Sequence, residues 1–290
     1  MNIQKSFGND EQLGELYIVP TPIGNLQDMT YRAVATLNKV DVIAAEDTRN
    51  TKKLLNHFDI PTYLISYHEH NKTTRGPELI DRIKHGEKIA VVSDAGMPGI
   101  SDPGSDLVKL ATEENLPVIV LPGANAALPA LVGSGLSTDS FYFYGFLPRK
   151  KKERLAELEI MQKQYSTIIF YESPHRLREM LVHVHMQFGN RKTVLARELT
   201  KRYEEYVRGT LEEVMNWADR EEIRGEFCVI VEGSDEEEFT NPFWWSHLSM
   251  IEHVEYYIKE KGMKSKEAIK QTSVDRKLSK REVYQAYHVE

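Results

Sequence analysis

Cysteine is almost absent from this chain, which has one cysteine, Cys228, among 290 residues. A single cysteine excludes an intrachain disulfide framework and a cysteine-rich zinc site. Cys228 lies in the strand-like stretch 226–231, where we expect a small buried apolar residue rather than a nucleophile. No apolar run approaches the roughly 20 residues that a membrane-spanning helix requires, and residues 1–10 lack the apolar core of a signal peptide. We therefore expect a cytoplasmic protein without a membrane partner. We also expect residues 1–13 to form a flexible N-terminal tail.

Two phosphate-binding signatures are also missing. The sequence contains neither the GxGxxG pattern of dinucleotide-binding folds nor the GxxxxGK[ST] phosphate loop. Their absence disfavours NAD and ATP as cofactors.

Basic residues are outnumbered: 37 lysines and arginines against 44 aspartates and glutamates give a net charge of −7. This negative charge argues mildly against a nucleic-acid partner. The basic residues are nevertheless concentrated. Residues 149–154 carry five basic residues and one acidic residue, and residues 259–281 carry nine basic residues and three acidic residues. Such patches permit a polyanionic partner at one face, although a solvated helix surface has the same composition.

Strand-like and helix-like stretches alternate through the first half of the chain. Short apolar runs typical of buried strands are found at residues 16–19, 42–45, 63–67, 89–93, 118–121 and 141–144. Stretches typical of helices are found at residues 30–39, 51–57, 73–85, 105–114 and 125–132. Strands that alternate with helices form βαβ units, so we predict an α/β fold with a mostly parallel sheet.

The second half is less regular, and we predict a partly antiparallel sheet for it. Its expected strands are residues 167–171, 193–197, 203–207 and 227–231, and its expected helices are residues 151–164, 174–188 and 211–218. After an acidic linker at 233–239, three short helices are expected at residues 245–261, 265–273 and 279–288, in a helix-turn-helix-like arrangement. The predicted domains are therefore residues 14–122, 123–234 and 240–290.

The most informative loop is residues 92–104, which follows a buried strand directly and contains three glycines and two prolines. In an open α/β sheet, ligands bind in the crevice at the carboxyl ends of the strands. We expect the glycines of this loop to allow a close backbone approach to a ligand. A tight turn without a ligand is the alternative.

Three other loops follow predicted strands in the same way. Residues 20–30 follow the first strand, and residues 45–49 end the second strand with two carboxylates, a hydroxyl and a guanidinium. Residues 122–125 lead directly into a predicted helix, whose first N–H groups are free donors for a carboxylate. The four loops therefore predict one site at the carboxyl edge of the sheet.

Six motifs in these loops and in the second half occur in a recognisable order. They are Thr21-Pro-Ile-Gly-Asn-Leu26, Ala45-Glu-Asp-Thr-Arg49, Ser66-Tyr-His-Glu-His-Asn71, Ser93-Asp-Ala-Gly-Met-Pro-Gly-Ile-Ser-Asp-Pro-Gly104, Tyr171-Glu-Ser-Pro-His-Arg176 and Arg197-Glu-Leu-Thr-Lys201. With them, residues 14–288 resemble the bacterial ribosomal RNA small subunit methyltransferase I family, a branch of the tetrapyrrole methylase (class III) superfamily. Met97 departs from the threonine expected there, and Ala124-Asn125 from the commoner Pro-Ser.

The resemblance implies a two-domain class III methyltransferase fold with a small C-terminal helical module. It also implies S-adenosylmethionine as cofactor, bound between the domains, and transfer of its methyl group to the 2′-hydroxyl of a cytidine ribose in the decoding centre of 16S rRNA. By this likeness, the cofactor is lined by Pro22, Gly24, Asp94, Met97, Gly99, Ile100, Asn125, Ala126, Tyr171 (or Phe170), Ala196, Cys228 and Val229. The dimeric relatives imply a homodimer.

Methyl transfer to a hydroxyl needs in-line positioning and benefits from a proton acceptor, because a ribose hydroxyl is a poor nucleophile. Asp47 is the first candidate for this catalytic role and His68 the second, with Arg49 holding a phosphate or orienting the carboxylate. His68, Glu69 and His70 also have the composition of metal ligands, but no third clustered ligand is evident, and we predict no metal site.

The basic patches predict where RNA binds. We expect phosphate contacts from the run 149–154, in particular Arg149, Lys150, Lys151 and Lys152, and from Lys280 and Arg281 in the C-terminal module. The aromatic residues Trp244, Trp245, Tyr256 and Tyr257 could stack on bases, but their helical spacing favours core packing. His175 and Arg176 suit an RNA-facing role and a helix start equally well.

The small ribosomal subunit is thus the expected partner. Two alternatives stay open: a tetrapyrrole (precorrin) methyltransferase, and an RNA-binding assembly factor without catalytic activity.

Overall fold

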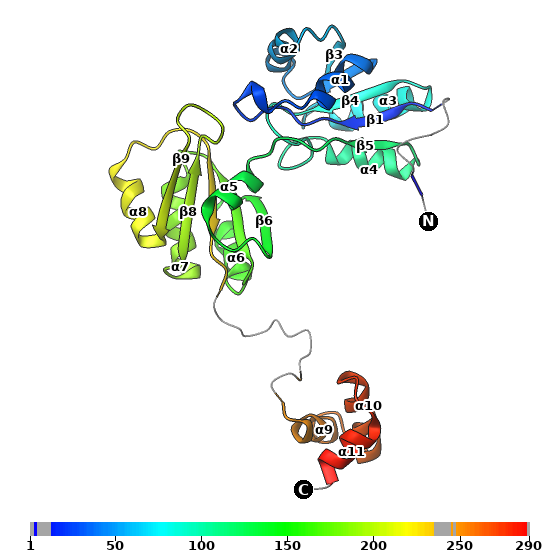
Figure 1. Cartoon of the computed structure of the whole chain (residues 1–290), viewed down its shortest axis with the longest axis vertical. Coiled ribbons are helices and arrows are strands. Elements are labelled where there is room, and N and C mark those ends of the chain that lie inside the picture. Colours follow the sequence, from blue (N-terminus) through cyan, green and yellow to red (C-terminus); the bar gives the residue numbers. More distant parts are fainter. Residues whose placement is uncertain (1–2, 5–12, 235–244, 246–247, 289–290) are drawn as a thin grey trace. The chain divides into compact units, whose positions relative to one another are not determined.

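The computed structural model describes residues 3–4, 13–234, 245 and 248–288. The chain divides into two compact units, Met1–Ser234 and Asp235–Glu290, which we describe separately (Figure 1). Most of the predicted linker 233–239, most of the predicted tail 1–13, and Trp244 lie outside the described residues. No helix among the described residues is long and apolar enough to cross a membrane.

The first unit begins with a five-stranded sheet in which every pairing is parallel. Its strands are β1 (Glu15–Ile18), β2 (Val42–Ala45), β3 (Tyr63–Ser66), β4 (Lys88–Val92) and β5 (Val118–Val120), in the order β3-β2-β4-β1-β5. Between them lie α1 (Tyr31–Lys39), α2 (Thr48–His57), α3 (Lys72–Lys84) and α4 (Ser105–Glu113). The predicted alternation of strands and helices is therefore confirmed for this half.

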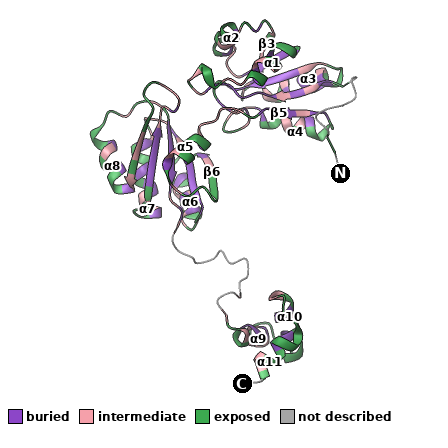
Figure 2. Cartoon of the chain, in the orientation of Figure 1, coloured by how far each residue is buried: buried purple, intermediate pink, exposed green. Residues whose placement is uncertain are grey.

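Helices cover both faces of this sheet, which explains why its central strands are apolar throughout. Alternate residues along each strand enter two different cores. Leu16, Ile18 and Val91 pack against α3 and α4, whereas Val19, Ala90 and Val92 pack against α1 and α2. Figure 2 shows this burial along the strands.

The second sheet is mixed, as the sequence predicts. Its strands are β6 (Phe141–Phe146), β7 (Thr167–Glu172), β8 (Lys192–Arg197), β9 (Glu205–Thr210) and β10 (Phe227–Val231), in the order β6-β7-β10-β8-β9. Only the β6–β7 pairing is parallel. The helices are α5 (Ala127–Ser134), α6 (Lys151–Met161), α7 (Leu177–Phe188) and α8 (Leu211–Arg220). Helix α5 packs on one face, while α6, α7 and α8 pack on the other.

Arg154 belongs to the predicted RNA-binding run 149–154, but it is 1% exposed. Its Nε donates to Nδ1 of His183 at 3.0 Å, and its guanidinium pairs with Glu179. A buried and paired guanidinium cannot reach a phosphate, so Arg154 is removed from the predicted RNA surface. The sequence leaves an RNA-facing role and a helix start open for Arg176. Its guanidinium donates to the carbonyl oxygens of Leu147 and Pro148 at 2.8 and 3.1 Å, so it holds the loop that leads into α6.

The second unit consists of α9 (Met250–Lys259), α10 (Ser265–Asp275) and α11 (Lys280–His288), as predicted from the sequence. Val254, Tyr257, Ala268, Ile269 and Val283 form its small core. Trp245 stacks on His253, and Tyr257 is buried beside the same ring. Core packing is therefore confirmed for Tyr257, and Tyr256 is partly buried against the same core.

Candidate active site

The loops that follow β1 and β4 are joined to each other. Thr21 and Gly96 form an isolated antiparallel bridge with two backbone hydrogen bonds of 2.9 Å. The Thr21 hydroxyl also donates to the carbonyl oxygen of Ser93 at 3.0 Å. Two of the predicted site loops are therefore hydrogen-bonded to each other at the carboxyl ends of the parallel strands.

The glycines of the loop 92–104 serve the loop itself. Gly96, Gly99 and Gly104 have φ angles of 82°, 83° and 135°, which residues with a Cβ rarely adopt. A Cβ on Gly99 would lie 3.2 Å from the Ser105 nitrogen, and a Cβ on Gly104 would lie 3.2 Å from the Gly99 nitrogen. The Gly99 N–H donates to the Pro103 carbonyl at 3.1 Å. At Gly99 and Gly104, the close fold of the loop on itself is therefore a further reason for glycine.

Asp47 is the N-cap residue of α2. Its carboxylate accepts from the Arg49 N–H at 2.8 Å and from the Arg49 guanidinium at 3.2 and 2.9 Å. These hydrogen bonds lower the pKa of Asp47 to about 2. A carboxylate with so low a pKa is a weak proton acceptor near neutral pH. The Arg49 side chain is 86% exposed, so its other donors are free to meet an anion from solution.

Asp94 connects α2 to the loop after β4. Its two carboxylate oxygens accept from the Asp47 N–H at 3.1 Å and from the Asn50 amide at 3.3 Å. Glu46 lies close enough for the Asp94 charge to act on it, and burial together with that charge raises the pKa of Glu46. Carboxylates thus gather where β2 and β4 end.

Asp102 is the third carboxylate at this place, beside Glu46 and Asp94, and the sequence analysis did not select it. Burial, followed by the charges of Glu46, Asp94 and Glu226, raises the pKa of Asp102 to about 6. Its carboxylate has no hydrogen bond or ion pair with any residue that the structure describes. We name Glu46, Asp94 and Asp102 the carboxylate cluster. Asp102 lies in the loop that the sequence singled out, but its burial depends on contacts between distant segments.

The carboxylate cluster faces the second sheet as well as the first. Glu226 precedes β10 and contributes to the shift of Asp102, while the Asp102 charge contributes to the raised pKa of Tyr171 on β7. Residues from both sheets therefore meet at this point within the first unit.

His68 follows β3 and is half-buried beside Glu46, whose pKa its charge lowers. Its Nδ1 atom is buried and has no hydrogen-bond partner among the described residues. The ring lies 6.0 Å from that of His70, whereas Glu69 pairs with Lys72 at 2.9 Å. Within the described ranges, no three His, Cys, Asp or Glu side chains are grouped as metal ligands.

A cavity of about 360 Å³ lies between the loop after β1 and helix α2. Its walls are Thr21, Pro22, Gly24, Leu26, Asn50, Thr51, Lys53, Leu54, His57, Ser93 and Asp94. Three predicted cofactor residues, Pro22, Gly24 and Asp94, are therefore together. The α2 residues Asn50, Lys53 and His57, which the sequence analysis missed, complete the polar part of the wall.

The turn 197–201 of the second sheet closes against this cavity. A Cβ on Gly24 would overlap the Lys201 side chain, and Gly24 has a φ angle of 145°. Lys201 is itself fixed by Glu198 and Glu226, each at 3.0 Å. Glycine is therefore needed at position 24, because the loop after β1 lies directly against the Lys201 side chain of the second sheet's turn.

Four of the predicted cofactor residues belong to the apolar core beneath α5: Ala196 and Cys228 are buried in it, and Ala126 and Tyr171 are partly buried against it. Burial and the nearby Glu226 raise the pKa of the Cys228 thiol to about 12, so it stays neutral. Asn125 lies next to them, but its side-chain oxygen accepts from the Leu128 N–H at 3.0 Å.

Three other predicted positions need comment. Val229 alternates with Cys228 along β10, so its side chain is buried on the opposite face against α6, α7 and α8. Phe170 lies in that same core, which favours Tyr171 over Phe170 as the pocket residue. Met97 packs against the core beneath α3 and α4, and Ile100 is largely exposed. The side chain of Val229 is therefore removed from the predicted cofactor pocket, whereas the partly buried Met97 stays a candidate.

The predicted RNA-binding residues are all exposed. Arg149, Lys150, Lys151 and Lys152 lie at the start of α6, where Lys150 pairs with Glu153 at 2.9 Å. Lys280 and Arg281 lie at the start of α11 in the second unit.

Comparison with known proteins identifies the family. A family model described as tetrapyrrole (corrin/porphyrin) methylases matches residues 15–215. A curated protein of Halalkalibacterium halodurans, named ribosomal RNA small subunit methyltransferase I, is 56% identical over 290 residues, which cover 100% of both chains. A protein of the same name from Bacillus subtilis is 56% identical over 287 residues, covering 99% of this chain and 98% of the relative. The chain belongs to the ribosomal RNA small subunit methyltransferase I family.

The resemblance based on six motifs is thereby confirmed, and so is the tetrapyrrole methylase fold. Among solved structures, a cobalt precorrin-4 methyltransferase has a TM-score of 0.57 at 16% identity, covering 75% of this chain and 94% of the other. A diphthine synthase has a TM-score of 0.58 at 13% identity, covering 76% and 90%. At these identities the likeness shows the fold alone.

Proposed function

We propose that this member of the ribosomal RNA small subunit methyltransferase I family transfers the methyl group of S-adenosylmethionine to the 2′-hydroxyl of a cytidine in small-subunit 16S rRNA, in the decoding centre. The observation that carries the proposal is the 56% identity, over the whole chain, to relatives of that name. The new bond joins the methyl carbon to the ribose oxygen, the carbon–sulfur bond breaks, and the hydroxyl proton leaves to an acceptor.

The carboxylate cluster fits the proposed cofactor. S-adenosylmethionine supplies a methyl group on a positively charged sulfonium and also carries an ammonium group. Asp102 has carboxylates as its charged neighbours and no hydrogen bond within the described residues. A cationic ligand would relieve the repulsion among these carboxylates, and the raised pKa values of Glu46 and Asp102 indicate a functional site. The partly buried Ala126 and Tyr171 would contact the adenine ring, while Ala196 and Cys228 belong to the core that supports them.

The 360 Å³ cavity beside α2 suits the acceptor nucleoside. It shares Asp94 with the carboxylate cluster, but its outer wall carries Lys53 and His57 instead of acids. Positive and neutral side chains favour a ribose-phosphate over a cationic cofactor. Asp94 would then border both sites, so that the methyl donor and the methyl acceptor lie side by side with no side chain between the reacting atoms, as direct transfer requires.

The proton acceptor is better matched by Glu46 than by Asp47. The hydrogen bonds from Arg49 keep Asp47 weakly basic, whereas burial and Asp94 make Glu46 more basic. His68 lies next to Glu46 and can take part in the same proton path. We propose that Asp47 instead orients Arg49, whose exposed guanidinium would hold an RNA phosphate.

The test is methyl transfer from labelled S-adenosylmethionine to small ribosomal subunits from cells that lack this protein. We expect label in the 16S rRNA, at the 2′-oxygen of one cytidine. Label in precorrin instead would support the tetrapyrrole alternative. RNA binding without a heat of cofactor binding in calorimetry would support a non-catalytic assembly factor.

A further inference from the structure

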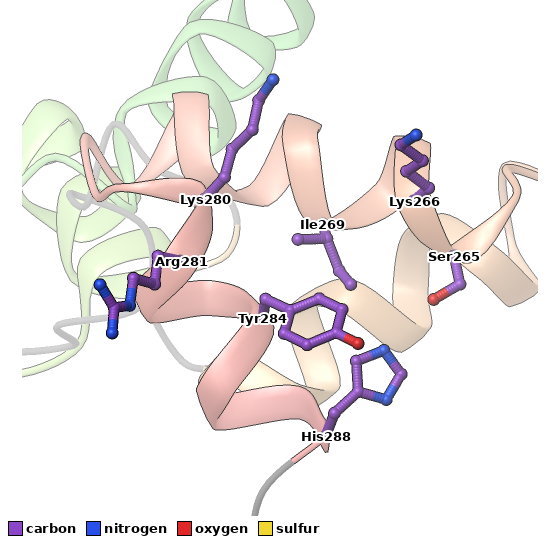
Figure 3. Close-up of a pocket in the computed structure, with 7 residues that line it drawn as sticks. All are labelled: Ser265, Lys266, Ile269, Lys280, Arg281, Tyr284 and His288. Carbon is purple, nitrogen blue, oxygen red and sulfur yellow. The ribbon is translucent and has the colours of Figure 1, made fainter.

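The second unit contains a cavity that the proposed reaction does not use. Its volume is about 540 Å³, within the range of roughly 300–1,000 Å³ that is typical of small-molecule sites. Helices α10 and α11 supply all of its walls: Ser265, Lys266, Ile269, Lys280, Arg281, Tyr284 and His288 (Figure 3). Three of these seven residues are cations and two carry rings, so the cavity combines positive charge with flat apolar surfaces.

The positive charge at this cavity is not neutralised within the described unit. Lys266, Lys280 and Arg281 are exposed, and none of them forms an ion pair with a described residue. The same holds for Lys264, Lys270 and Lys277 on the same two helices and their connecting turn. By contrast, Lys259 on α9 pairs with Glu255 at 2.6 Å. Unpaired cations concentrated on two helices favour a polyanion.

Tyr284 supplies an unused aromatic surface. Its side chain is 55% exposed, although Ile269 beside it is buried and apolar. The His288 ring lies 4.5 Å from the Tyr284 ring, and Figure 3 shows both rings at the cavity next to Ile269 and Ser265. Tyr257, in contrast, is buried and donates its hydroxyl to Asp275 at 2.6 Å. Tyr284 is therefore the ring on which a ligand can stack.

We propose that this cavity binds an unpaired nucleotide of single-stranded RNA, with its base on Tyr284 and the neighbouring phosphates on Lys266, Lys280 and Arg281. Exposed bases of single strands stack on aromatic side chains, whereas bases within a duplex cannot reach them. The cations line the same cavity as the rings, so a strand whose base enters the cavity passes its neighbouring phosphates close to them (Figure 3). The cavity would thus anchor RNA and take no part in the chemical step.

This inference rests on the proposed RNA substrate and adds a specific anchoring site. It is tested with the full-length protein and a fluorescein-labelled 12-nucleotide single-stranded RNA, followed by fluorescence anisotropy. The variants are Tyr284→Ala, Tyr284→Phe and the triple variant Lys266→Ala/Lys280→Ala/Arg281→Ala. Lys259→Ala is the matched control, because it removes an exposed lysine of the same unit that lies outside the cavity. Cofactor calorimetry and the thermal melt show whether each variant is folded.

The loss of stacking in Tyr284→Ala should weaken binding of the single strand about 5- to 100-fold, with a much smaller effect on duplex RNA. Tyr284→Phe keeps the ring and should bind within about twofold of the unmodified protein. The triple variant should reduce the slope of log affinity against log salt by about 2, since each lost phosphate contact on a single strand contributes about 0.7. Lys259→Ala should change the affinity little.

Unchanged binding by folded Tyr284→Ala would overturn the proposal, and so would equal weakening of single-stranded and duplex RNA. Failure of the proposed function is visible separately, as a lack of methyl transfer to small subunits by the unmodified protein. If transfer is present, Tyr284→Ala should raise KM and leave kcat unchanged, because uniform binding is lost. A lower kcat with an unchanged KM would contradict an anchoring role.

Discussion

Replacing Asp102 by asparagine should stabilise the protein in the absence of cofactor. The carboxylate is half-buried among other carboxylates, and its pKa is raised from 3.8 to about 6. A raised pKa means that the folded state binds the proton more tightly than the unfolded state does. The ionised form therefore destabilises the folded protein, and this cost is fully present above about pH 6.

The magnitude follows from the pKa shift. A shift of about 2 units corresponds to about 3 kcal/mol, and partial exposure to solvent reduces this to about 1–2 kcal/mol. Asp102→Asn removes the charge and should raise the free energy of unfolding at pH 7 by that amount. The advantage should shrink as the pH falls from about 6 to about 4, because protonation removes the same charge from the unmodified protein.

Urea unfolding of both proteins at pH 4.5 and pH 7, without cofactor, measures this difference. Asp28→Asn, at an exposed carboxylate of the same unit, is the control and should change little. The same Asp102→Asn variant should bind S-adenosylmethionine at least tenfold more weakly in calorimetry, because a negative charge that faces the cation is lost. A variant that is less stable than the unmodified protein at pH 7 would refute the account of the carboxylate cluster.

Three other substitutions test separate parts of the structure. Glu46→Gln should lower the rate of single-turnover methyl transfer about 100-fold or more, and Asp47→Asn should lower it less than that. A larger loss with Asp47→Asn than with Glu46→Gln would restore Asp47 as the proton acceptor. Gly24→Ala should lower the free energy of unfolding in urea, because its Cβ would overlap Lys201 and its φ angle is positive, and an unchanged stability would contradict that contact. Arg154→Ala should cost about 2–4 kcal/mol in urea unfolding by leaving buried polar groups unpaired, and a change below 0.5 kcal/mol would indicate that Arg154 is dispensable.

The order and kind of the secondary-structure elements could be predicted because the signals are local. Strand β2, for example, is a short buried apolar run with Val42 and Ala45 at its ends, as the sequence predicts. The loops at the carboxyl ends of the strands could also be predicted, since parallel strands bring their ends to one edge.

The faces and the burial of individual side chains could not be predicted from local signals. Val229 and Cys228 are neighbours in the sequence, yet the alternation along β10 places them in different cores. Arg154 looks like the lysines before it, but its helix face turns it toward His183. The raised pKa of Asp102 comes first from burial and then from the charges of Glu46, Asp94 and Glu226, which distant segments supply.

The central claim is tested most directly by mass spectrometry of 16S rRNA from small subunits that were incubated with the protein and S-adenosylmethionine. The account predicts one additional methyl group, on the 2′-oxygen of a cytidine in the decoding centre, and its loss with Glu46→Gln. A methyl group on a base, or no methyl group on the RNA while the cofactor is bound, would contradict it.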